Sequence, residues 1–406
     1  MPLLSLWHSN PEAIDQFTIE QVVSSAGDGN LRDGSLCSTE ILSFLSEVRS
    51  EKLGQYAGHC LSIRFDKSGL VLQDIVNELG RRLDYLVTNG RYQGTQNAIG
   101  FDGLWRSPEG KTIVVEVKTT DAYRISLDTL STYRQKLISS SEIAGDSSIL
   151  IVVGRQDTGE LEAQVRGSRH AWDIRLISIE ALIKMVFLKE NSDEPETGAK
   201  IRSVLMPVEY TRLDGLVDVM FTTAKDLESD LTAEVPAEIE SAAVAETATE
   251  PNLVVHEMTD ARLLQLKREA IVGAMSARLG EPLIKKSRAL YQSPDHKKRI
   301  ACTLSKRYET GSTYWYAYHP KWDDFLKDVE QGFFVLGCMD LDSAFALPRH
   351  IIHKMLDDLH ISQSDNGRYW HVHINGRGQN EYELVIPWKA NVDLAPYRVQ
   401  LSPPVS

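Results

Sequence analysis

The sequence predicts an α/β protein, in which a mixed sheet flanked by helices forms the core and a separate C-terminal α+β domain follows. Three observations support this prediction. Helical and strand-like patterns alternate along the first half, an apolar run at 148–154 is suited to a buried central strand, and an acidic segment at 226–258 separates two parts. The 406 residues are enough for two or three domains, and the 42% hydrophobic content is enough for buried cores.

Helices are predicted at the start of the chain. Apolar residues recur at three- and four-residue intervals over 11–56, and we treat 1–60 as an N-terminal helical segment. A further helix is predicted over 69–83, where the apolar stripe consists of Leu72, Ile75, Val76, Leu79 and Leu83. This helix opens the main domain, which we place at 61–225.

A β-hairpin is predicted after this helix. A strand over 99–105 leads into Ser-Pro-Glu-Gly at 107–110, which is a turn sequence, and the β-rich stretch 111–120 follows. The other elements predicted in this domain are a strand at 85–88, a helix at 126–139, the central strand at 148–154, a strand at 174–179 and a helix at 179–190.

The C-terminal domain, 259–406, has an α+β pattern. It opens with a predicted helix over 259–279. Strands are predicted at 299–305, 312–319, 332–339, 368–375 and 381–388, and helices at 322–330 and 348–359.

The charge is unevenly distributed. The net charge of -13 argues against a basic surface over the whole chain. Nine acidic residues and no Lys or Arg lie in 226–258, which we interpret as a flexible acidic linker. Ten basic residues against three acidic ones lie in 262–299, and such a local patch can bind phosphates whatever the total charge.

Several classes of protein are excluded by what the sequence lacks. No apolar run reaches the roughly 18–20 residues that a membrane helix needs, and the N-terminus has no secretory pattern. The four scattered cysteines form no CxxC pair, so we expect reduced thiols in a cytoplasmic protein. Walker, GxSxG and HExxH motifs are missing, so we expect no nucleotide cofactor and no serine- or zinc-hydrolase chemistry.

The chemistry is concentrated in the hairpin. Asp102 lies at the start of one predicted strand, and Glu116 and Lys118 lie two residues apart on the next. Side chains at positions i and i+2 of a strand share a face, so the hairpin brings two carboxylates and one ammonium together. Mg²⁺ takes hard carboxylate ligands and keeps waters and open positions for a phosphate. The alternative is an exposed hairpin with an ordinary ion pair.

The stretch 69–180 resembles the PD-(D/E)XK nuclease superfamily, and this resemblance implies that the mixed sheet and its helices form a restriction-endonuclease-like core. Its aspartate corresponds to Asp102, its second acid to Glu116 and its lysine to Lys118, while Phe101 stands where proline is common. The resemblance implies that the two acids and the backbone carbonyl of Val117 bind the metal. It also implies an acid on the preceding helix, for which Glu78 is our choice and Asp74, one turn earlier, the competitor.

Other residues are candidates for contact with DNA, each with a solvated loop or helix face as the alternative. Those of the main domain lie in the loop at 89–97, on the helix at 126–139 and in the segment at 154–172: Arg91, Gln93, Gln96, Asn97, Tyr133, Gln135, Arg155, Arg166, Arg169 and His170. Those of the C-terminal domain are Lys285, Lys286, Lys297, Lys298 and Arg299. The aromatics at 314–318 are expected in the core rather than on a base-stacking platform, and a metal at His371 and His373 is disfavoured.

These observations lead to an expected function. The chain is expected to be a Mg²⁺-dependent DNA endonuclease, with Mn²⁺ able to substitute, acting in restriction or defence against foreign DNA. This setting rests on analogy between folds. The C-terminal domain is expected to recognise DNA or to sense a trigger. The alternatives are a repair or recombination nuclease on branched or single-stranded DNA, an RNase, and a non-catalytic DNA-binding module. A homodimer is plausible because cutting both strands is simplest with two sites.

Overall fold

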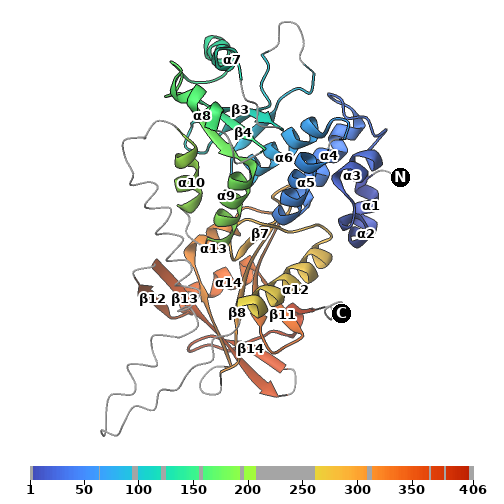
Figure 1. Cartoon of the computed structure of the whole chain (residues 1–406). Helices are drawn as coiled ribbons and strands as arrows, with labels where there is room; N and C mark the ends of the chain where they lie inside the picture. Colours follow the sequence, from blue (N-terminus) through green and yellow to red (C-terminus); the bar gives the residue numbers. More distant parts are fainter. Residues whose placement is uncertain are drawn as a thin grey trace, which may run out of the picture. The chain divides into compact units, whose positions relative to one another are not determined.

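The chain divides into two compact units, Met1–Thr223 and Ala224–Ser406. The structure is a computed structural model (Figure 1). It describes residues 3–63, 65–93, 99–119, 125–154, 159–192, 196–206, 261–308, 313–364, 367–378 and 381–401. The predicted acidic linker at 226–258 lies outside the described residues. Both units combine helices with sheets, so the α/β class predicted from the sequence is confirmed.

Helices dominate the beginning of the first unit, as the apolar spacing predicts. Their starts are capped: the hydroxyl of Thr18 accepts a hydrogen bond from Gln21 N–H, and that of Ser35 accepts one from Ser38 N–H. These helices are α1 (Leu3–Ser9), α2 (Pro11–Asp15), α3 (Ile19–Ser25), α4 (Leu36–Glu47), α5 (Ser50–Ser62) and α6 (Ser68–Arg82). Residues 3–60 do not form a core of their own, because Phe44 and Tyr56 share one buried cluster with Val76 of α6 and with the sheet.

A mixed sheet forms the centre of the first unit. Its strands follow the order of the sequence: β1 (Leu86–Asn89), β2 (Gly103–Arg106), β3 (Thr112–Lys118), β4 (Ser148–Val153) and β5 (Ile174–Ser178). The first three strands are antiparallel, whereas β3, β4 and β5 are parallel. The predicted hairpin is confirmed, with Gly110 in its turn at φ +82°. Every residue of β4 is buried, as predicted for a central strand.

The two faces of this sheet are covered differently. On one face, Trp105, Ile113 and Val115 belong to the same buried cluster as the apolar residues of α6. A Cβ at Gly80 of α6 would lie 2.5 Å from the Trp105 ring, so this helix packs on the sheet more closely than a larger residue allows. On the other face, Leu104 and Val114 pack with α7 (Leu127–Ser139) and α8 (Gly159–Arg166). The unit also contains α9 (Ile179–Asn191) and α10 (Thr197–Leu205).

The second unit contains two sheets. A long helix, α12 (Ala261–Leu279), precedes both and packs on the six-stranded sheet of the described residues. The strands of this sheet are, in order, β16 (Arg398–Gln400), β11 (Ser343–Pro348), β10 (Gln331–Cys338), β8 (Lys298–Ser305), β7 (Leu290–Gln292) and β6 (Ile284–Lys285). The other sheet contains β12 (Ile361–Ser364), β13 (Gly367–Gly378), β14 (Glu381–Val385) and β15 (Val392–Asp393), with β9 (Tyr314–Tyr318) paired to β13. The unit also contains two short helices, α13 (Pro320–Phe325) and α14 (Arg349–Met355).

The aromatic strand of the second unit belongs to its core, as predicted. Tyr314, Tyr316 and Tyr318 alternate along β9 and are at most 1% exposed. They pack with Phe334 and Leu336 in a single buried cluster. Across the described ranges, no helix has both the length and the apolar character needed to span a bilayer.

Candidate functional site

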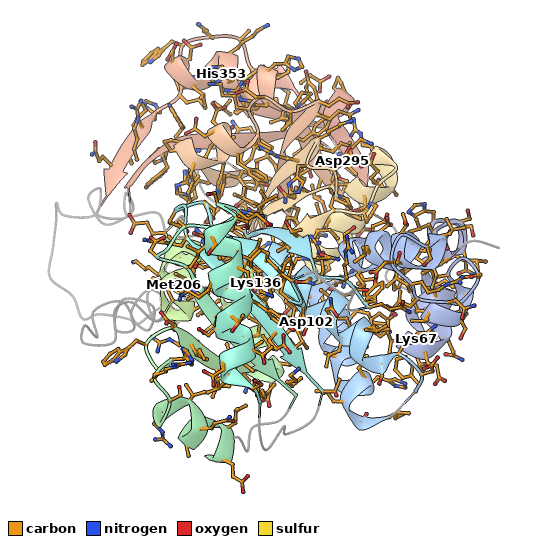
Figure 2. All side chains as sticks on the ribbon, turned by 90° about the horizontal axis from the view of Figure 1, so that it is seen from above. Lys67, Asp102, Lys136, Met206, Asp295 and His353 are labelled. Carbon is orange, nitrogen blue, oxygen red and sulfur yellow. The ribbon has the colours of Figure 1, made fainter. Side chains whose placement is uncertain are left out.

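Asp102 stands just before β2 and is held by bonds from several sides; it is labelled in Figure 2. Its N–H donates to Val115 O at 3.0 Å, which continues the hairpin pairing by one residue. Its carboxylate Oδ2 accepts the backbone N–H of Val117 at 2.7 Å. The Asp102 carboxylate is therefore fixed against the backbone between Glu116 and Lys118.

Glu116 and Lys118 lie at the carboxyl end of β3, on the same face of the sheet. Lys118 Nζ forms an ion pair with Glu116 Oε1. The side chains are 15% and 33% exposed, so this pair is accessible from solvent. Lys118 O accepts Gly154 N–H at 3.0 Å, which ties this strand end to the end of β4. The structure thus brings together the three residues that the sequence predicted to act together.

The pKa of Asp102 shows how crowded the acids are. Burial, and after it the nearby Glu116 carboxylate, raise this pKa from the ordinary value of 3.8 to about 6. The hydrogen bond from Val117 and the charge of Lys118 lower it, but less than the other two effects raise it. Ionised Asp102 is therefore a cost to the fold when no cation is bound, and a cation between the two acids would relieve it.

The raised pKa predicts how stability depends on pH. Because the folded pKa of about 6 exceeds the unfolded 3.8, the stabilising contribution is complete below pH 3.8 and is lost as the pH rises through 6. Asp102→Asn does not titrate, so we expect it to gain about 1–3 kcal/mol on wild type between pH 4 and pH 7 without divalent cations. Urea unfolding of both proteins across this range measures the difference. A constant difference would show that folding does not shift the pKa of Asp102, and a falling difference would show that the ionised carboxylate stabilises the fold.

The two acids of α6 that were candidate metal ligands, Glu78 and Asp74, are both bonded to neighbouring side chains. Glu78 Oε1 accepts a hydrogen bond from Arg82 Nε at 2.8 Å, and Glu78 Oε2 lies 3.4 Å from Arg81. Both carboxylate oxygens of our first choice are therefore engaged by arginines of its own helix. Asp74 is fully buried, and one of its oxygens accepts the Tyr92 hydroxyl at 2.5 Å. Burial raises the pKa of Asp74 to about 7.

Two amides of α6, which the sequence analysis did not single out, contact Asp102 instead. Gln73 and Asn77 are 4% and 1% exposed and donate to Asp102 O at 3.1 and 2.8 Å. They lie at positions i and i+4 on the side of the helix that faces the sheet. The sequence did contain a sign of this contact, because two amide residues four positions apart lie beside the apolar stripe of the helix. Its partner could be found only once the helix was placed against β2.

The candidate DNA contacts of the first unit are scattered. Arg91, Gln93 and Gln135 are exposed, and a Cβ at Gly100 would lie 3.2 Å from the Tyr133 ring, near the Asp102 strand. Further along, Arg166 lies 3.9 Å from Glu162, and Arg169 and His170 both bond Asp128 at the start of α7. Arg155, Gln96 and Asn97 lie outside the described residues. The role of these residues in DNA contact stays a prediction.

Among the basic candidates of the second unit, Lys298 and Arg299 are used within the fold. Lys298 Nζ donates to Leu279 O and pairs with Glu281 at 2.6 Å. Arg299 bonds Phe325 O at 2.9 Å and lies over the ring of the same residue. Lys297 is 63% exposed, beside Asp295. Lys285 ends β6, and Lys286 pairs with Leu290 through its backbone. The patch expected from the sequence is thus partly engaged in holding α12 and α13.

His371 is a structural residue in this geometry. Its Nδ1 accepts the Trp315 indole N–H at 3.0 Å, so its Nε2 carries the proton that bonds Ser362 Oγ at 2.7 Å. Both ring nitrogens of His371 therefore bond protein side chains. The ring also stacks on that of His373. More generally, no group of three or more His, Cys, Asp or Glu side chains suited to a metal occurs in the described parts of the chain. The four cysteines are buried free thiols.

Comparison with known proteins adds no family to this geometry. No protein-family model matches the chain, and no curated protein sequence matches it at significant similarity.

Proposed function

We propose that this chain is a Mg²⁺-dependent DNA endonuclease, with Mn²⁺ able to substitute, whose site is formed by Asp102, Glu116 and Lys118. One observation carries the proposal: the Asp102 carboxylate bonds the Val117 N–H, directly between Glu116 and the ion-paired Lys118. The Glu116 carboxylate raises the pKa of Asp102, and the partly exposed ammonium of Lys118 lies beside Glu116. This combination is typical of a site that binds a cation and a phosphate.

The surrounding architecture supports the same proposal. The order of elements in the first unit is α6, three antiparallel strands, α7 and a strand parallel to β3. This order is compatible with the restriction-endonuclease-like core that the resemblance implies. It places the acids at the carboxyl end of a strand in a parallel pair, an edge where sheets of this kind hold ligands.

The donor set fits a hard divalent cation. Asp102 and Glu116 supply carboxylate oxygens and Val117 a backbone carbonyl, and Mg²⁺ completes its coordination with waters and substrate oxygens. When bound, such an ion polarises the phosphoryl group and lowers the pKa of a water. A third acid from α6 is not part of this proposal, since the Glu78 oxygens bond Arg81 and Arg82.

The residues of the chain have distinct roles in this proposal. Asp102 presents one fixed oxygen to the backbone and has a second, Oδ1, that can face the ligand. Lys118 holds its ammonium beside Glu116, where it can contact a phosphate oxygen or orient the attacking water. A purely structural ion pair would place the same charges together, so the two interpretations differ in what removing Lys118 does to activity.

Lys118→Met should reduce Mg²⁺-dependent cleavage of plasmid DNA by about 10²–10³-fold, because the cation that stabilises developing charge is lost. Lys111→Met is the matched control: Lys111 pairs with Asp146 at the other end of the same hairpin and is 43% exposed. We expect the control to cut like wild type. Initial rates on supercoiled plasmid, with EDTA as the blank, measure both variants. Equal rates for the two variants would place the chemistry elsewhere.

The same assay decides among substrates. Supercoiled, linear, branched and single-stranded DNA and a labelled RNA are offered to wild type with Mg²⁺ or Mn²⁺. Cutting of duplex DNA supports a role in restriction or defence, whereas preference for branched or single-stranded DNA supports repair or recombination. RNA cleavage alone would overturn the DNA assignment. Binding of DNA without any cleavage would favour the non-catalytic module.

A further inference from the structure

Three hydrogen-bond donors converge on one carbonyl oxygen, that of Asp102. Gly90 N–H donates at 2.9 Å, the Gln73 side chain at 3.1 Å and the Asn77 side chain at 2.8 Å. Both amides come from the inner face of α6 and are almost fully buried. The bond from Gly90 alone would satisfy a buried carbonyl, which has only two lone pairs. The amides therefore do more than satisfy this carbonyl.

The orientation of Asn77 is fixed by its surroundings. Trp105 Nε1–H donates to Asn77 Oδ1 at 2.9 Å, so the amide nitrogen must point to Asp102. A Cβ on residue 103 would lie 2.2 Å from the same Oδ1 atom, so only glycine at this position admits the amide. Gly103 directly follows Asp102 in the chain. The contact between α6 and the Asp102 segment is thus built with little freedom to shift.

The bonds of Asp102 connect this clamp to its carboxylate. The carbonyl is held from α6 and the N–H from Val115, so the main chain of Asp102 is fixed on both sides of its Cα. The direction of the Cα–Cβ bond follows from the main chain, and the carboxylate then reaches the Val117 N–H at 2.7 Å. Loss of the amides would let the carboxylate move relative to Glu116.

We propose that Gln73 and Asn77 are positioning residues, which hold the Asp102 carboxylate at the spacing from Glu116 that a divalent cation needs. This inference rests on the proposed function for its consequence, the binding of the cation. The clamp itself can be tested without it. Partners that orient metal ligands in this way typically change metal affinity or activity 10–100-fold when they are replaced.

The test compares near-isosteric variants. Gln73→Met removes one donor at similar volume, and Asn77→Asp keeps the Trp105 acceptor but turns the donor into a second acceptor facing the carbonyl. Val76→Ala is the stability control, since Val76 lies on the same helix and its buried side chain belongs to the apolar core of the first unit. Two readouts are recorded: the hydrogen-exchange rate of the Val117 amide, and Mn²⁺ affinity by titration.

We expect Val117 exchange to rise about tenfold or more in Gln73→Met and Asn77→Asp relative to Val76→Ala, and Mn²⁺ affinity to fall about 10–100-fold. If Asn77→Asp fails to fold, Gln73→Met decides. If wild type binds no Mn²⁺ but the two variants still speed Val117 exchange, the clamp stands and the nuclease proposal falls. If both variants match Val76→Ala in exchange and in affinity, Gln73 and Asn77 serve only the packing of α6.

Discussion

Asp102→Asn is expected to abolish metal-dependent DNA cleavage, by about 10³-fold or more, while leaving the protein at least as stable as wild type at pH 7–8. The loss follows from the site proposed for the metal, because an amide cannot supply the charge of a carboxylate ligand and several kcal/mol of charge stabilisation disappear. The unchanged or increased stability follows from the raised pKa of Asp102, because the ionised carboxylate costs the fold free energy when no cation is bound.

Lost activity together with retained stability distinguishes an acid that serves the reaction from one that serves the fold. Asn can still accept the Val117 N–H, so the local geometry is retained while the charge is removed. Asp146→Asn is the matched control: Asp146 lies just before β4, pairs with Lys111 of the hairpin and is 48% exposed. Plasmid cleavage and urea unfolding are measured side by side. A variant that is both active and destabilised would show that Asp102 serves the fold and not the reaction.

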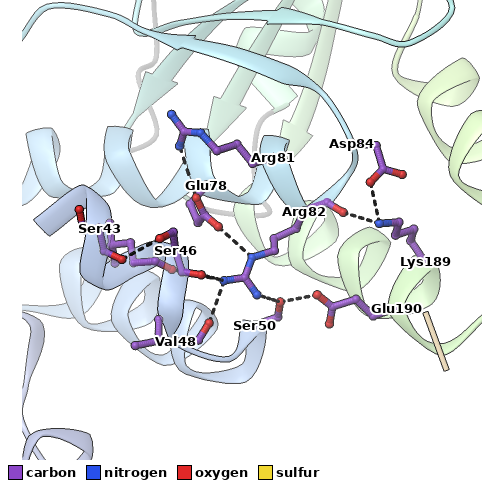
Figure 3. A network of polar contacts seen from close by, with 11 residues as sticks. Ser43, Ser46, Val48, Ser50, Glu78, Arg81, Arg82, Asp84, Lys189 and Glu190 are labelled. Carbon is purple, nitrogen blue, oxygen red and sulfur yellow. Dashed lines mark hydrogen bonds and ion pairs between the residues drawn. The ribbon is translucent and has the colours of Figure 1, made fainter. Parts of the chain in front are cut away.

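Arg82→Met is expected to lower the stability of the first unit by about 3–5 kcal/mol, the range for removing one partner of a buried ion pair. Figure 3 shows the network around this guanidinium, which is 6% exposed. It bonds Glu78 at 2.8 Å and the carbonyls of Val48 and Ser46 at 2.8 and 3.2 Å. It also reaches Ser50, whose hydroxyl donates to Glu190 of α9 at 2.7 Å.

Removing Arg82 leaves the Glu78 charge and several carbonyls buried without this donor, and each such group costs about 1–3 kcal/mol. Arg81→Met is the control: Arg81 neighbours Arg82 and also pairs with Glu78, but it is 35% exposed, so we expect a loss under about 1 kcal/mol. Hydrogen exchange at the amides of α6 reports the first unit by itself. Similar losses in the two variants would mean that the network of Figure 3 stabilises little.

The local pattern of the sequence was sufficient for the elements that carry the site. The alternation of β3, the turn at Gly110 and the apolar stripe of α6 are short-range features, and the helix, the hairpin and the buried strand β4 follow from them. Because side-chain direction in a strand depends on the local backbone alone, the sequence also predicted that Glu116 and Lys118 share a face. The pairing of Asp102 with them needed only the short hairpin.

The partners of α6 could not be predicted in this way. Nearly every polar residue of this helix is buried, so its sequence gives no single exposed face from which to choose. The ion pair of Glu78 with Arg82 joins positions i and i+4 of one helix, so local spacing could have predicted it. The bonds of Arg82 to the carbonyls of Leu45 and Val48 could not be predicted locally, because they join residues more than thirty positions apart. The same holds for the basic residues Lys298 and Arg299, whose partners lie on other elements.

The sequence by itself determined the α/β class, the hairpin and the three residues of the candidate site, since all of these depend on spacing within about twenty residues. Only the tertiary structure decided that Gln73 and Asn77 hold Asp102, that Arg82 bonds the carbonyls of Leu45 and Val48, and that the pKa of Asp102 is raised. Hydrogen-bond partners and desolvation are properties of what surrounds a group in space. They are set when distant segments pack, and local patterns do not contain them.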